Sequence, residues 1–128
     1  MYNHLKVDMD YCADPIWVSE EPLDASPAFM NTSLDEFDLP KPLVHSFKLY
    51  QQLWENANWS DYIGPSDDHK FPGSNLVYDL ISEMEPILAA ELKKVYPDSR
   101  VYFTRYGSYR LIEVGGPQIT GIHYTMVN

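Results

Sequence analysis

The sequence predicts an α+β fold, with a small mixed four-stranded sheet and two main helices packed on one face of it. Two long segments carry apolar residues at three- and four-residue spacing, which is typical of helices with a buried face. Short runs rich in strand-forming residues lie on either side of them. Of the 128 residues, 45% are hydrophobic and 14% aromatic, which is enough to form a core. We therefore expect residues 1–128 to form a single domain.

The first predicted strand runs from Leu5 to Tyr11, where apolar and polar residues alternate. This alternation places Lys6, Asp8 and Asp10 on the face opposite the core. Two carboxylates at that spacing could bind a hard cation such as magnesium. A small metal-dependent hydrolase or nuclease that uses Asp8 and Asp10 is therefore one alternative function. The sequence shows no evident third ligand, so a solvated strand face is the simpler interpretation.

Residues 12–42 are expected to be a long irregular segment, because five prolines interrupt a stretch rich in acidic and small polar residues. Cys12 is the single cysteine, which excludes an internal disulfide, and we expect it to be a small buried residue. Loops longer than about 12–15 residues in compact domains are often functional. We predict a partner-binding surface here, with carboxylates for charge and aromatic side chains as anchors: Asp14, Trp17, Glu20, Glu21, Asp24, Phe29, Asp35, Glu36, Phe37 and Asp38.

Two helices are predicted next. The first covers residues 43–58, begins after Pro42 and buries an aromatic stripe. The second covers residues 75–95, and Pro86 inside it is expected to kink or divide it. The Gly- and Pro-rich residues 58–74 should form a loop between them. That loop contains the cluster Asp67-Asp68-His69, which we interpret as solvated because adjacent residues in a turn rarely converge on one metal ion.

Three strands are predicted at the C-terminal end, over residues 100–106, 110–114 and 119–126. We expect residues 100–106 to pair in parallel with the first strand, since two helices connect them, and the last two strands to extend the sheet antiparallel. Arginines and tyrosines of residues 100–110 form a basic aromatic patch of the kind that stacks on single-stranded nucleic acid.

The charge distribution argues against nucleic acid as the partner. The formal net charge is −10, and residues 1–40 contain nine acidic residues against Lys6 alone, which places −8 of it there. Such a field repels phosphate backbones and attracts basic proteins. The sequence has no apolar run long enough for a membrane span and no signal-peptide core near its start. We therefore expect a cytoplasmic protein without direct nucleic-acid or membrane contacts.

Catalytic motifs are missing from the sequence. It has no phosphate-binding Gly-rich loop, no paired CxxC, no HExxH and no nucleophile elbow, and its four histidines lack metal-ligand spacing. We therefore expect a protein that is not an enzyme and that uses neither a cofactor nor a metal.

A resemblance to a protein family implies a more specific function. Motifs of small bacterial proteins are similar to four stretches of this sequence: Asp10-Tyr-Cys-Ala-Asp-Pro-Ile-Trp17, Phe37-Asp-Leu-Pro40 before a helix containing Trp54, Glu91-Leu92 and Val101-Tyr-Phe103. The pattern resembles immunity proteins of bacterial toxin systems, notably those of contact-dependent growth inhibition. The resemblance implies a protein that binds and neutralises the C-terminal domain of a cognate toxin. We expect this toxin domain to be a basic nuclease whose active site is covered by acidic residues. A cytosolic adaptor protein is the remaining alternative, and the sequence leaves the oligomeric state open.

Overall fold

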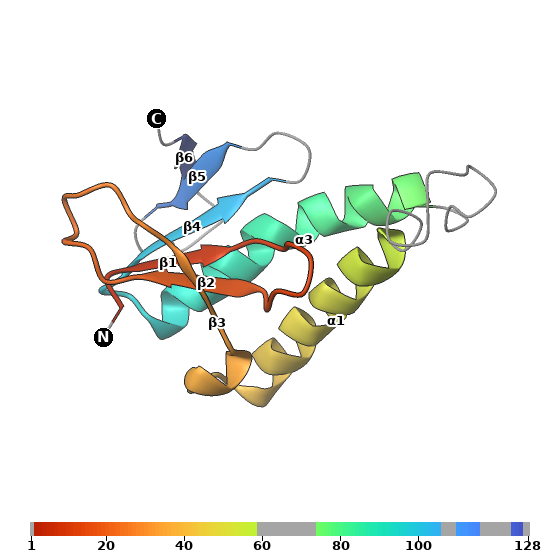
Figure 1. The fold of residues 1–128 in the computed structure, drawn as a ribbon, viewed down its shortest axis with the longest axis horizontal. Helices are drawn as coiled ribbons and strands as arrows, with labels where there is room; N and C mark the ends of the chain where they lie inside the picture. Colours follow the sequence, from red (N-terminus) through yellow and green to blue (C-terminus); the bar gives the residue numbers. More distant parts are fainter. Residues whose placement is uncertain (1, 59–73, 106–109, 116–123, 127–128) are drawn as a thin grey trace.

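The computed structural model describes residues 2–58, 74–105, 110–115 and 124–126, and its strands form one sheet (Figure 1). The strand order is β3-β2-β1-β4-β5-β6. In chain order the elements are β1 (His4–Val7), β2 (Ile16–Ser19), β3 (Met30–Thr32), the short 3-10 helix η1 (Leu34–Glu36), α1 (Lys41–Ala57), α3 (Ser74–Val95), β4 (Arg100–Thr104), β5 (Leu111–Val114) and β6 (Tyr124–Met126).

The strand pairing confirms the predicted α+β class and corrects the strand count. β1 and β4 pair in parallel at the centre of the sheet, and every other neighbouring pair is antiparallel. The four predicted strands correspond to β1, β4, β5 and β6. Within the described residues the sheet has six strands, however, because β2 and β3 lie within the segment for which the sequence predicts no regular structure.

The sequence did not predict these two strands, because prolines and acidic residues in 12–42 are typical of irregular segments. β2 contains the run Ile16-Trp17-Val18, which has high strand propensity, and it forms a hairpin with β1. The first strand also ends earlier than predicted, at Val7, so Asp8 and Asp10 lie in the connection that follows it. Cys12 is in this connection with a φ of 59° and is exposed, so the expectation of a buried cysteine is wrong.

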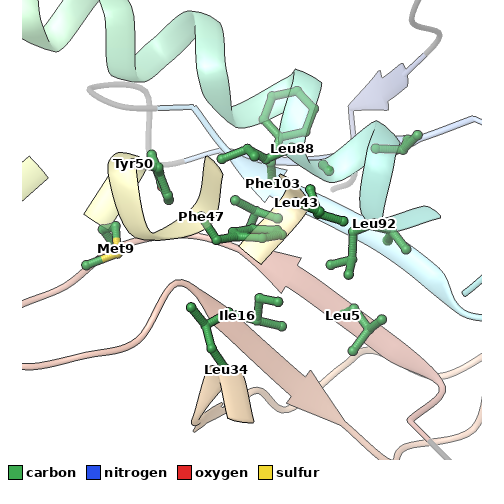
Figure 2. Packing of buried hydrophobic residues seen from close by; sticks show 14 of the residues in the cluster. Leu5, Met9, Ile16, Leu34, Leu43, Phe47, Tyr50, Leu88, Leu92 and Phe103 are labelled. Atoms are coloured by element: carbon green, nitrogen blue, oxygen red, sulfur yellow. The ribbon is translucent and has the colours of Figure 1, made fainter. Parts of the chain in front are cut away.

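The core lies between the helices and one face of the sheet (Figure 2). Alternate residues of the strands point into it because side chains in a strand alternate between the two faces. Leu5, Ile16 and Phe103 on the strands lie against Phe47 of α1 and Leu92 of α3, and all of them are almost fully buried (Figure 2). Both helices thus pack against the same face of the sheet, as the sequence predicts.

The two helices follow the predicted apolar stripes closely. α1 begins at Lys41, with Pro42 in its first turn, and buries Phe47, Tyr50 and Trp54. α3 runs from Ser74 to Val95 with Pro86 inside it. Of the kink or division expected at Pro86, the division does not occur, since one missing amide removes only a single hydrogen bond and packing holds the rest of the helix.

A buried hydrogen bond joins the two helices. The Tyr50 hydroxyl on α1 donates to Glu85 Oε2 on α3 at 2.7 Å, and both side chains are buried. Burial and the nearby Glu85 carboxylate raise the pKa of Tyr50 well above its usual value, so the hydroxyl keeps its proton at neutral pH.

Replacing Tyr50 by Phe is expected to destabilise the fold, because a buried carboxylate loses a hydrogen-bond donor. We expect the free energy of unfolding to fall by about 1–3 kcal/mol. Urea denaturation of wild type and Tyr50→Phe measures the difference. Tyr96→Phe is the matched control, because the half-buried Tyr96 packs on Phe37 through its ring. Equal midpoints for wild type and Tyr50→Phe would contradict the expectation.

Some predictions concern residues outside the described part of the chain. The loop of residues 59–73 with its Asp67-Asp68-His69 cluster, the turn at 106–109 and the start of the last predicted strand all lie there. Among the described helices, none combines the length and apolar character that a membrane crossing requires.

Candidate protein-binding surface

The face of the sheet opposite the helices, called here the helix-free face, carries the polar and aromatic residues of the strands. His4 and Lys6 of β1 point to it, because Leu5 and Val7 point to the core. The same alternation places Trp17 of β2, Tyr102 of β4 and Glu113 of β5 on this face. The connection between β2 and β3, which leads out from the sheet in Figure 1, returns to this face at Phe29.

Cations and aromatic rings alternate across the helix-free face. Lys6 Nζ lies 5.0 Å from the centre of the Trp17 ring and 4.8 Å from that of Phe29. Phe29 packs edge-on against Tyr102, with 5.8 Å between the ring centres. The Arg100 guanidinium lies 5.5 Å from the Tyr102 ring centre. These contacts pack the side chains of the helix-free face against one another, although no helix covers that face. Trp17 and Phe29 remain half-buried.

Each cation of this face also has a carboxylate partner. Lys6 Nζ lies 3.5 Å from Asp8 Oδ2. Arg100 donates from Nε to Glu113 Oε2 at 2.8 Å and from Nη2 to Glu113 Oε1 at 2.6 Å. This two-point hydrogen bonding raises the pKa of the Arg100 guanidinium further above its usual value. The positive charges of the helix-free face are therefore internally compensated.

Residues 20–24, called here the acidic segment, follow β2 and contain Glu20, Glu21 and Asp24. Four consecutive backbone carbonyls of this segment accept hydrogen bonds from side chains of other parts of the chain. The bonds run from Asn3 Nδ2 to Glu20 O (3.4 Å) and Glu21 O (3.1 Å), from His4 Nε2 to Pro22 O (2.9 Å), and from Arg100 Nη1 to Leu23 O (2.8 Å). The acidic segment is thus fixed to β1 and β4 although it has no regular structure.

His4 is the buried member of this set, with no exposed surface. Because a carbonyl can only accept, Nε2 must carry the proton that it donates to Pro22 O. In the neutral ring, Nδ1 then accepts from the Tyr102 hydroxyl at 2.8 Å. Burial raises the pKa of Tyr102 to about 12, so this hydroxyl is protonated at neutral pH and is able to donate. The two hydrogen bonds therefore define the tautomer of His4.

The backbone of the connection is held at its base as well. Ser19 Oγ, which is buried, accepts from the amides of Glu21 and Ala28 at 3.2 Å each. In contrast, the side chains of Glu20, Glu21 and Asp24 are exposed. Within the described ranges none of these three carboxylates forms an ion pair. The acidic segment therefore combines a fixed backbone with three uncompensated charges.

The other predicted binding residues are placed differently. Asp35, Glu36 and Asp38, the second acidic group, are exposed around η1 and before α1, away from the acidic segment (Figure 1). Asp14 is half-buried and accepts from the Leu34 amide at 3.2 Å. Phe37 is only 8% exposed and belongs to the core, so its ring is not accessible to a partner. The structure thus brings Trp17 and Phe29 to the same face as the acidic segment, and places Asp35, Glu36 and Asp38 apart from it.

Comparison with known proteins does not identify a function for this surface. No protein-family model, curated protein or solved structure matches the chain.

Three residues that hold the acidic segment were missed by the sequence analysis. Asn3, His4 and Arg100 are 18, 18 and 77 positions from the carbonyls that they contact most closely. No local pattern relates residues at such separations. The sequence indicates only that two of them could lie near each other. His4 lies next to the start of the predicted first strand, and Arg100 lies at the start of its predicted parallel partner.

The Asp8 and Asp10 pair has local structural roles. Asp8 Oδ1 accepts from the Met9 amide at 2.9 Å, and Asp10 Oδ1 accepts from the Tyr11 amide at 2.8 Å. No group of three or more potential metal ligands occurs within the part of the chain that the structure describes. The metal-dependent hydrolase stays a prediction without an observation in its favour.

The pH dependence of stability should reveal the state of Asp8. Burial raises the pKa of Asp8 above 3.8, and this effect exceeds the opposing attraction of Lys6. A raised pKa in the folded protein means that protonated Asp8 contributes stability below pH 3.8, and this contribution is lost as the pH rises through the folded pKa.

Asp8→Asn is therefore expected to raise the free energy of unfolding at neutral pH, and the gain should vanish below pH 3.8. Urea denaturation at several pH values measures it, with the exposed Asp10→Asn as control. A loss of stability in Asp8→Asn at neutral pH would show instead that the Lys6 ion pair outweighs the burial of the carboxylate.

Proposed function

We propose that this protein is an inhibitor of the immunity type, which binds a basic toxin domain through the acidic segment and blocks its active site. The observation that supports this function is the combination described above: three exposed carboxylates, unpaired among the described residues, on a backbone that four side-chain hydrogen bonds hold in place. Charged loops used only for solubility have no need of such fixation.

Fixation of the acidic segment favours tight binding. A loop that is already ordered loses less conformational entropy when a partner docks, so more of the contact energy appears as affinity. Like charges at Glu20, Glu21 and Asp24 repel one another, and this cost is recovered when a basic surface lies against them. The half-buried Trp17 and Phe29 rings beside the segment supply apolar contact area.

A nuclease is the class of toxin that this chemistry fits best. The active site of a nuclease attracts phosphate groups through basic side chains, and carboxylates on a rigid support compete for the same side chains. The same negative field disfavours direct binding of nucleic acid to this surface.

Affinity capture from the native host tests the proposal. The tagged wild type is compared with a variant that carries Glu20→Gln, Glu21→Gln and Asp24→Asn, and with a control that carries Asp35→Asn, Glu36→Gln and Asp38→Asn. Both variants lose three negative charges. The proposal expects wild type and control to retain one basic domain that arrests growth when it is expressed alone. Equal capture by all three proteins, or capture of no basic domain, would contradict it.

A further inference from the structure

A pocket of about 470 Å³ opens on the helix-free face between the sheet and the acidic segment. Its walls come from three strands and from the β2–β3 connection. The lining residues on which its chemistry depends are Lys6, Asp24, Ser26, Phe29, Tyr102 and Thr104. Its volume lies in the range of ligand pockets, roughly 300–1,000 Å³.

The charges around the pocket favour a cation. Lys6 and Arg100 both line it, but Asp8 and Glu113 already neutralise them. Asp24 also lines it, and its carboxylate forms no ion pair within the described residues. The net charge of the lining with its ion-pair partners is therefore negative, and the neighbouring glutamates of the acidic segment add to it.

The walls of the pocket fit the stem of a long basic side chain. Phe29, Pro27 and Leu111 give apolar surface against which methylene groups can pack. Ser26 and Thr104 give hydroxyl oxygens that accept hydrogen bonds from an ammonium or guanidinium group, beside the Asp24 carboxylate. An uncharged aromatic side chain would gain the same apolar contacts but would leave Asp24 without a partner.

We infer that this pocket receives a lysine or arginine side chain of the partner protein, with its charged end at Asp24. The inference rests on the proposed function, because it specifies one contact of the same interface. It also explains why the acidic segment is tied to Arg100 through Leu23 O: this bond fixes the residue that precedes Asp24. A fixed backbone there keeps the carboxylate at the rim of the pocket.

Binding of small probes tests the inference without the partner. Amide NMR spectra of the protein are recorded during titration with the N-acetyl N-methylamides of arginine, lysine, phenylalanine and glutamic acid. We expect saturable shifts in residues 24–29 and Lys6 with the two basic probes, with dissociation constants in the millimolar range. Asp24→Asn should weaken this binding at least about fivefold, whereas Asp35→Asn, at an exposed carboxylate of the second acidic group, should leave it unchanged.

The results of the titration and of the capture experiment distinguish failure of the pocket inference from failure of the proposed function. Equal shifts with all probes, preference for the phenylalanine probe, or no saturable shift would overturn the inference, and the capture experiment would still decide the function. Selective binding of basic probes that Asp24→Asn weakens supports the inference. If capture then recovers no basic domain, the proposed function fails although the pocket has the predicted selectivity.

Discussion

Neutralising the three carboxylates of the acidic segment is expected to slow association with the basic partner by about tenfold to a hundredfold at low salt. The variant carries Glu20→Gln, Glu21→Gln and Asp24→Asn. All three side chains are exposed and unpaired within the described residues, so the fold should be retained. Stopped-flow kinetics with the captured toxin domain, over a salt series, measure the association rate.

The second acidic group provides the control for this measurement. Replacing Asp35, Glu36 and Asp38 by their amides changes the net charge by the same amount at a different place on the surface. If the acidic segment forms the contact, this variant should associate nearly as fast as wild type at physiological salt, where charges farther apart than about 8 Å are screened from one another. Equal slowing by both variants would show that only the net charge matters.

His4→Phe is expected to lower the free energy of unfolding by about 2–4 kcal/mol, because two polar groups lose their partner in one change. Phe preserves the ring that packs on Tyr102, with 5.8 Å between the ring centres, but offers no hydrogen bonds. The Tyr102 hydroxyl then lacks its acceptor and Pro22 O lacks one of its donors. Chemical denaturation measures the loss of stability.

Hydrogen exchange distinguishes a local from a global effect of this substitution. Amides of residues 20–25 should exchange faster in His4→Phe, because the bond to Pro22 O no longer holds the acidic segment. Tyr102→Phe is the matched control, since it removes only the bond between Tyr102 and His4. That variant should lose less stability and keep the protection of the segment. Unchanged exchange in His4→Phe would contradict the role of His4 in holding it.

The sequence predicts most of the fold because most of its elements carry a local pattern. The aromatic stripe of α1 and the apolar stripe of α3 give both helices to within two residues at either end. The parallel pairing of β1 and β4 follows from the two helices that connect them. β2 and β3 were missed because strands of three and four residues among prolines lack a clear period. Pairing stabilises them instead, β2 with β1 and β3 with β2.

The candidate site is only partly visible in the sequence. The excess of acidic residues before residue 40 shows where negative charge gathers. It does not show that Glu20 and Asp24 are on a fixed segment while Asp14 accepts a backbone hydrogen bond and Phe37 is buried. These differences arise from contacts between residues far apart in the chain, such as Arg100 with Leu23, which no single-sequence pattern encodes.

Protection of growing cells shows whether the acidic segment neutralises the toxin. The basic domain recovered by capture is expressed from an inducible promoter, together with wild type, the variant of the acidic segment or the variant of the second acidic group, at matched protein levels. We expect wild type and the variant of the second acidic group to restore growth, whereas the variant of the acidic segment should not. Full protection by the variant that lacks Glu20, Glu21 and Asp24 would contradict the proposed function.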